Sequence, residues 1–107
     1  MAELPDVGFN LIREIEMLEP FGCGNPEPLI GSRRLDVLYP RILKDAHLKM
    51  KLRQKNQSLD AIGFNMSAFF SQLNASSKVD AVYTPSVNEW EGQKSIQLHL
   101  KALRPSR

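Results

Sequence analysis

The sequence of 107 residues lacks several features that define common protein classes. It has a single cysteine, Cys23, which cannot form an internal disulfide and has no CxxC or Cys/His companions for a zinc site. No apolar run approaches the roughly 20 residues needed to cross a bilayer, and the N-terminus lacks the basic and then apolar order of a signal peptide. These absences predict a cytoplasmic protein. Its length and its 42% of hydrophobic residues predict one domain with one modest core.

Charge is segregated along the chain, although the formal net charge is only +2. Residues 1–28 hold six acidic residues and one basic residue. Residues 33–55 hold eight basic and two acidic residues, so an anion is expected to bind there. A solvated basic face is the competing interpretation.

The N-terminal part predicts a helix followed by a stiff junction. Apolar residues recur at helical spacing over 7–18, with Asp6 as a plausible N-cap and Pro20 as the stop. The segment EPFGCGNPEPLI, residues 19–30, holds three prolines and two glycines, which indicates a shaped turn. Its glycine amides could form an anion-binding concavity, or the segment could simply set the angle between the helix and the next element.

The remainder predicts strands with one short helix. The clearest strand is 47–54, where Leu48, Met50 and Leu52 alternate with Lys49, Lys51 and Arg53. Further strands are expected at 32–43, 59–64, 79–87 and 95–103, with turns at 55–58 and 88–93 and a short helix at 67–73.

This order predicts a mainly β fold, a five-stranded OB-fold barrel with an N-terminal α-helix and a short helix between strands 3 and 4. A split sheet with two helices would show a similar pattern. The expected division is a helix and junction at 1–28 and a nucleic-acid-binding barrel at 29–107.

The junction and the last strands resemble a known family. The residues that carry the resemblance are Glu19-Pro20-Phe21-Gly22, Gly24-Asn25-Pro26-Glu27-Pro28, then Asn88, Trp90, Gly92 and Gln97-Leu98. They are similar to the region after the catalytic core of the RecJ family of bacterial single-strand-specific exonucleases. The resemblance implies an OB domain that helps to hold single-stranded DNA beside a two-lobed, metal-dependent core that cuts 5′ to 3′.

The chemistry that the resemblance implies for the parent enzyme needs aspartates and histidines around two divalent metals, Mg or Mn. The string Asp45-Ala46-His47 is the nearest approach, and His99 is the only other histidine. We therefore expect this chain to be a fragment with no catalytic residue, no metal site and no cofactor of its own.

Candidate DNA-binding residues follow from the strand pattern. Lys49, Lys51 and Arg53 would form an outward row that tracks phosphates, unless they only keep the strand soluble. Arg33, Arg34 and Arg41 could extend this groove. Trp90, at a hairpin tip, could stack on a base or pack against the first helix.

Three function classes remain open at this stage. The expected one is a single-stranded DNA-binding accessory domain of an enzyme of DNA repair and recombination, with the catalytic lobes of the same parent polypeptide as its other partner. The alternatives are a protein-interaction or docking module with little DNA affinity, and an independent enzyme.

Overall fold

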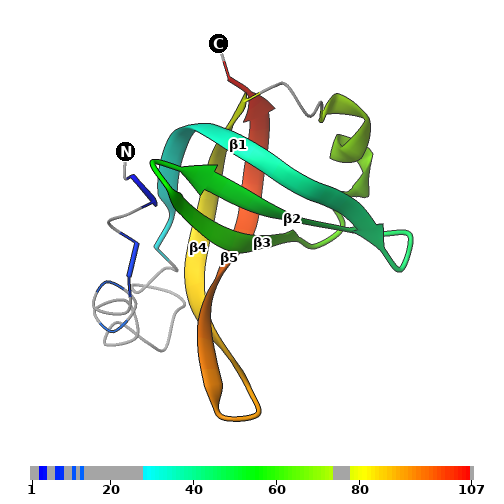
Figure 1. Cartoon of the computed structure of the whole chain (residues 1–107). Coiled ribbons are helices and arrows are strands. Elements are labelled where there is room, and N and C mark those ends of the chain that lie inside the picture. The colour runs from blue at the N-terminus through cyan, green and yellow to red at the C-terminus, as the bar shows by residue number, and fades with distance from the viewer. Residues whose placement is uncertain are drawn as a thin grey trace.

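The computed structural model describes residues 3–4, 7–8, 11, 13, 28–73 and 78–106. The elements, in chain order, are β1 (Ile30–Leu43), β2 (His47–Gln54), β3 (Gln57–Gly63), the 3-10 helix η2 (Ser67–Gln72), β4 (Lys78–Trp90) and β5 (Gln93–Pro105) (Figure 1). Of the predicted helix at 7–18, the structure describes Leu11 and Arg13, which are helical, and Val7 and Gly8, which are not. The rest of that helix and the junction up to residue 27, with Phe21 and Cys23, lie outside the described residues. No helix within the described ranges is long and apolar enough to cross a membrane.

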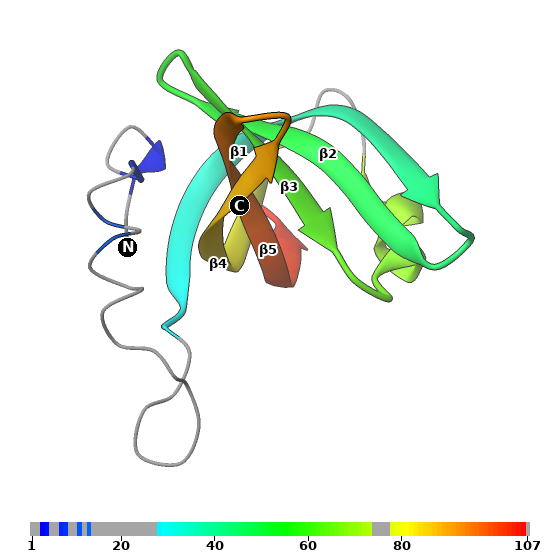
Figure 2. The same ribbon diagram turned by 90° about the horizontal axis from the view of Figure 1, so that it is seen from below.

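The five strands form a closed barrel in the order β1-β2-β3-β5-β4. All neighbours are antiparallel except β3 and β5, which run parallel. β1 is strongly curved: its first half pairs with β4 and its second half with β2 (Figure 2). The predicted mainly β fold, an OB-type barrel, is therefore confirmed, and the short helix between the third and fourth strands is the 3-10 turn η2.

The two-residue period of the strands produces the core. In β2 the predicted apolar side chains at 48, 50 and 52 are all buried, while the residues between them face outward. The same alternation in the other strands contributes buried side chains to one cluster, which includes Leu35, Val37, Tyr83 and Leu98. Burial of this apolar face fixes the strand register, because a shift of one residue would turn every apolar side chain outward.

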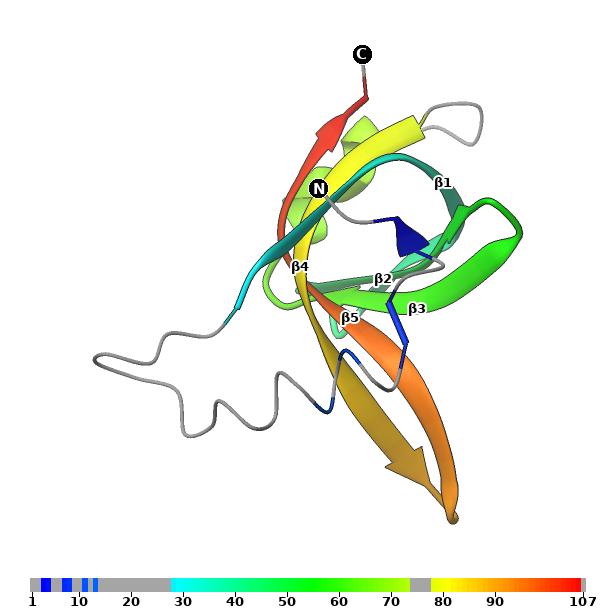
Figure 3. The same ribbon diagram turned by 90° about the vertical axis from the view of Figure 1, so that its left-hand side faces the viewer.

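The hairpin turns are shorter than the sequence predicts. Only Lys55 and Asn56 separate β2 from β3, with φ angles of 50° and 69°, and only Glu91 and Gly92 separate β4 from β5, with φ angles of 49° and 78°. Two consecutive residues at positive φ are typical of type I′ turns, whose twist matches that of the strands. The polar residues that the sequence assigns to turns therefore continue the strands, and the β4–β5 hairpin projects beyond the barrel (Figure 3).

Residues from outside the strands contribute to the barrel interior. Leu4 and Val7 belong to the core cluster, and the Leu4 amide donates a hydrogen bond to Gln54 Oε1 at 2.8 Å. In η2, Phe69 packs against the core, whereas Phe70 is 39% exposed. The predicted division into 1–28 and 29–107 stays a prediction.

Candidate nucleic-acid interface

The three basic residues of β2 occupy consecutive outward positions. Lys51 and Arg53 are exposed and Lys49 is half-buried, and all three alternate with the buried apolar residues of the strand. Because β2 lies between β1 and β3, the row runs along the middle of a three-stranded outer surface. The strand therefore presents cations at a spacing of about 6.6 Å, two residues at about 3.3 Å each.

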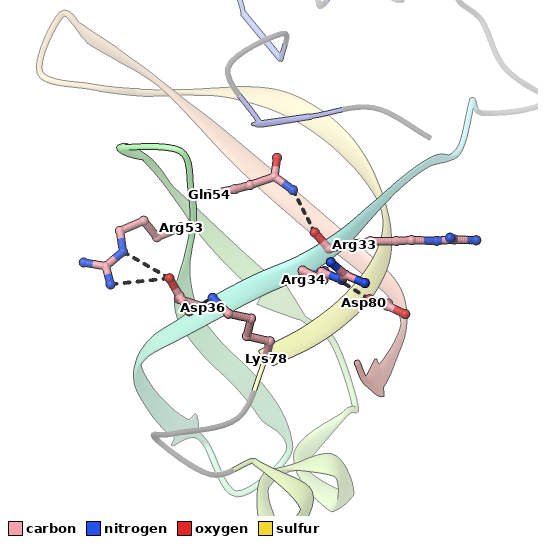
Figure 4. Close-up of polar contacts among 7 residues, drawn as sticks. All are labelled: Arg33, Arg34, Asp36, Arg53, Gln54, Lys78 and Asp80. Atoms are coloured by element: carbon pink, nitrogen blue, oxygen red, sulfur yellow. Dashed lines mark hydrogen bonds and ion pairs between the residues drawn. The ribbon is translucent and has the colours of Figure 1, made fainter. Parts of the chain in front are cut away.

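Acidic neighbours pair with part of this row. Lys51 Nζ lies 3.7 Å from Asp60 Oδ1 on β3, and Arg53 Nη2 lies 3.4 Å from Asp36 Oδ2 on β1. Asp36 also accepts a hydrogen bond of 2.6 Å from Lys78 Nζ (Figure 4). The Lys78 hydrogen bond, with help from Arg53, lowers the pKa of Asp36 below its ordinary value despite some desolvation.

Two of the predicted arginines lie in a β-bulge of β1. The pairing with β4 shifts between Ser32 and Leu35, so that Arg33 and Arg34 face one partner, Asp80. Arg34 has a φ of 56°, and its backbone amide donates a hydrogen bond of 3.1 Å to Asp80 Oδ1 (Figure 4). The Arg33 carbonyl accepts a hydrogen bond of 2.7 Å from Gln54 Nε2. The bulge is thus held through its backbone, and both arginine side chains remain exposed.

Asp80 is the anchor of this bulge. Burial alone would raise the pKa of Asp80, but hydrogen bonds from the Arg34 amide, Ser106 and Arg104 outweigh it and lower that pKa. Arg104 Nε lies 3.1 Å from Asp80 Oδ2, so the carboxylate joins β1, β4 and β5.

Arg41 lies elsewhere on β1, directly opposite Lys49 of β2. The structure therefore brings one predicted arginine to the basic row and places the other two on the part of β1 that pairs with β4.

Trp90 ends β4 at the tip of the projecting hairpin and is 75% exposed. Its neighbours Glu89 and Glu91 are exposed and acidic. Its cross-strand partner Gln93 precedes Gln97, the first β5 residue paired with β3, by four residues, or about 13 Å of strand. Trp90 thus lies beyond the three-stranded surface, at its β5 side.

Two exposed aromatic residues near the row are missing from the sequence-based candidates. Tyr39, 72% exposed, lies in a second bulge of β1, and Phe64, 55% exposed, follows β3. The dipeptide Tyr39-Pro40 inside a predicted strand was a signal for the bulge, since proline cannot donate to a ladder. Nothing in the pattern singled out Phe64.

Across the barrel from β2, the outer wall of β4 and β5 holds an apolar groove of about 360 Å³. It is lined by Asp80, Ala81, Val82, Ala102, Leu103 and Arg104. For the described ranges, no three His, Cys, Asp or Glu side chains are grouped so that they could hold a metal ion. The expected lack of a metal site stays a prediction.

Comparison with known proteins gives a consistent family. The model of the RecJ OB domain matches residues 2–102. The single-stranded-DNA-specific exonuclease RecJ of Bacillus subtilis is 33% identical over 98 residues, which cover 90% of this chain and 12% of that protein. RecJ of Dickeya dadantii is 27% identical, with 94% of this chain and 18% of that protein covered.

A solved structure supports the same family. RecJ of Thermus thermophilus in complex with Mg2+ matches with a TM-score of 0.70 and 26% identity, over 97% of this chain and 15% of that one. The chain thus spans less than a fifth of the relatives that it matches. With a family model matched over residues 2–102 and a fold that matches that of a solved RecJ, this chain belongs to the RecJ OB domain family.

Proposed function

We propose that this chain is the single-stranded DNA-binding accessory domain of a RecJ-like 5′ to 3′ exonuclease that acts in DNA repair and recombination in the cytoplasm. The observation that carries the proposal is the outward row Lys49, Lys51 and Arg53 on the middle strand of the outer surface. In OB folds the face of strands 2 and 3 binds oligonucleotides, so the cations lie where a backbone would pass.

A salt titration tests the proposal. Each full phosphate contact on a single strand adds about 0.7 to the magnitude of the slope of log affinity against log salt, so the row contributes at most about 2. Replacing all three residues with glutamine should remove most of that slope and leave the fold intact, since surface changes usually cost under about 0.5 kcal/mol each. The measurement is a titration of a labelled, unstructured oligonucleotide at several salt concentrations, with circular dichroism as the folding control. Unchanged slopes in a folded triple variant would overturn the role of the row.

The nuclease chemistry of the parent enzyme, with Mg or Mn, belongs in this proposal to the part of the polypeptide outside this chain. The purified chain supplied with either metal should therefore leave a 5′-labelled single strand intact, because two-metal hydrolysis needs ligands clustered around both ions. Incubation with the labelled strand and gel analysis checks this. Processive 5′ to 3′ digestion that persists after a further purification step would contradict the assignment.

Docking within the parent polypeptide is the second candidate function. The groove on the wall of β4 and β5 supports it, because an apolar surface across the barrel from the basic row could be covered without blocking a bound strand. Its proposed occupant is the catalytic part of the same parent chain. Val82→Asp should weaken association with that part, expressed separately, and leave DNA binding by the isolated domain unchanged; equal association would reject this use of the groove.

A further inference from the structure

The charges of the basic row are not equivalent, because its two ends have different neighbours. Lys51 and Arg53 lie beside carboxylates, but none of the ion pairs among the described residues involves Lys49 or Arg41. Arg41 is the direct cross-strand partner of Lys49, and facing residues have Cβ atoms about 4.5–5.5 Å apart. Like charges at that spacing oppose folding, so the pair is unfavourable unless an anion lies between the two side chains.

An exposed aromatic ring lies near this pair on its β1 side. The pairing of β1 with β2 shifts between Leu38 and Arg41, which places Tyr39 in a bulge two residues from Arg41. Tyr39 has a φ of 53° although it precedes Pro40, and both facts make this backbone unfavourable for a bulky residue. Such strain is concentrated at functional sites, and here it displays an aromatic residue that is 72% exposed.

A second exposed ring lies on the β3 side. Ile62 is the cross-strand partner of Lys49, and Phe64 follows directly after the end of β3, where its ring contacts His47, which shares the outward face of β2 with Lys49. His47 and His99 contact the Phe64 ring in edge-to-face geometry, with ring centroids at 5.3 Å and 5.8 Å. The Asn65 amide donates to His47 Nδ1 at 3.1 Å, so the supporting imidazole is itself held. The ring is thus pre-positioned, yet 55% of the residue remains exposed.

We infer that single-strand binding is centred on the Arg41–Lys49 pair, with a phosphate between the two cations and neighbouring bases stacked on Tyr39 and Phe64. This inference rests on the proposed function and narrows it to one end of the outer surface. Aromatic stacking accepts any unpaired base, so this subsite takes single strands of any sequence and rejects duplexes, whose base faces are covered. Trp90 is a poorer centre because two exposed acids, Glu89 and Glu91, flank it, and Lys94, the cross-strand partner of Glu89, offsets only one of them.

Single substitutions at matched positions test whether the Arg41–Lys49 pair binds a phosphate. Arg41→Gln and Lys49→Gln should each lower the salt slope by about 0.7 on an unstructured DNA strand of about 16 nucleotides. Arg53→Gln is the matched control, because it is the same substitution as Arg41→Gln at a position where Asp36 already lies beside the cation. It should lower the slope much less. Both pair variants should melt at or above the wild-type temperature, because the repulsion between the two cations is removed.

Variants that preserve the backbone conformation test whether bases stack on Tyr39 and Phe64. Tyr39→Asn removes the ring but tolerates positive φ, and Phe64→Leu keeps apolar bulk; each should weaken binding about 5- to 150-fold without changing the slope. Tyr39→Phe and Phe64→Trp keep a ring and should bind like the wild type.

The outcomes separate the two levels of the proposal. No salt-dependent binding by the wild-type chain would remove the proposed function itself. Binding that is lost equally in Arg53→Gln and Lys49→Gln, or that is unaffected by Tyr39→Asn and Phe64→Leu, would overturn the subsite and leave the proposed function standing. Tighter binding to a duplex than to the single strand would also overturn it.

Discussion

Lys49, Lys51 and Arg53 share a charge sign and a strand, but their cross-strand neighbours give them different electrostatic surroundings. The pairs Lys51–Asp60 and Arg53–Asp36 are solvent-exposed, with 51% and 49% of the two basic side chains accessible. Exposed pairs are worth about 0–1 kcal/mol, so a DNA phosphate can replace the carboxylate at small cost. We therefore expect the neighbouring acid at these two positions to weaken phosphate binding without preventing it.

Truncation of Trp90 tests whether its indole ring stacks on a base. If it stacks on a base, Trp90→Ala should cost about 1 to 3 kcal/mol of binding to a strand of about 16 nucleotides. The melting temperature of the variant should be nearly unchanged, because Trp90 is 75% exposed and truncating its side chain removes little packing. Titration and thermal melting of the same samples check both parts.

A short oligonucleotide is the control for Trp90. A strand of about 4 nucleotides should bind wild type and Trp90→Ala equally if it occupies the β2 surface, because the hairpin tip lies about 13 Å of strand farther on. A large fall in melting temperature would instead assign Trp90 to packing.

At the level of strands, the sequence predicts the alternation of side chains within a strand but not how the strands pair. The outward position of Lys49 follows from a period of two within one strand, so the sequence predicts it. The closeness of Asp36 to Arg53 depends on the register of β1 against β2, and that of Arg34 to Asp80 on a bulge; both are set by tertiary pairing.

Strand ends set the other limit of sequence-based prediction. Phe64 gains its surroundings only because β2 and β5 flank β3, so its ring contacts are invisible in a linear pattern. Leu4 is fully buried although it lies in no periodic segment. The sequence thus predicts which β2 residues face outward but not which neighbours complete a site.

Asp36 on β1 pairs with Arg53 on β2 and Lys78 on β4, so this network links three strands. Hydrogen bonds from Lys78 and Arg53 lower the pKa of Asp36, so the folded state favours the ionised carboxylate. This contribution to stability is fully present above the ordinary carboxyl pKa of about 3.9 and is lost as pH falls through the lower pKa of the folded state. Asp36→Asn should therefore cost up to about 1 kcal/mol at pH 7 and make the acid-induced fall in stability shallower.

Urea denaturation of wild type and Asp36→Asn between pH 7 and pH 2 measures the effect. Asp45→Asn, in the turn between β1 and β2, controls for the removal of one surface carboxylate, since Asp45 is in none of the ion pairs among the described residues. Parallel profiles for wild type and Asp36→Asn would show that the network adds nothing to the link between β1 and β4.

For the whole molecule, closure of the barrel depends on residues far apart in the chain. β1 pairs with both β2 and β4, and the parallel contact of β3 with β5 completes the ring. The interior is then filled partly from the N-terminal segment, since Leu4 and Val7 are 0% and 2% exposed. Glu3 also pairs with Lys55 in the β2–β3 turn, close to the Gln54 contact of Leu4. We therefore expect the segment before the junction to belong to the same folding unit as the strands.

A truncation series tests this unity of the fold. Removing residues 1–28 deletes the buried side chains of Leu4 and Val7 and leaves their site in the core exposed to water, so the 29–107 chain should lose several kcal/mol of the about 5–15 kcal/mol typical of a domain. Leu4→Ala in the full chain should cost about 2–5 kcal/mol, and Glu3→Gln, which removes only an exposed pair, under about 1 kcal/mol. Urea denaturation of the three variants beside the wild type gives the free energies of unfolding. A 29–107 chain that unfolds at the wild-type midpoint would make the N-terminal segment a separate unit, whereas a loss shared by the truncation and Leu4→Ala but not by Glu3→Gln would assign the stabilisation to the buried leucine.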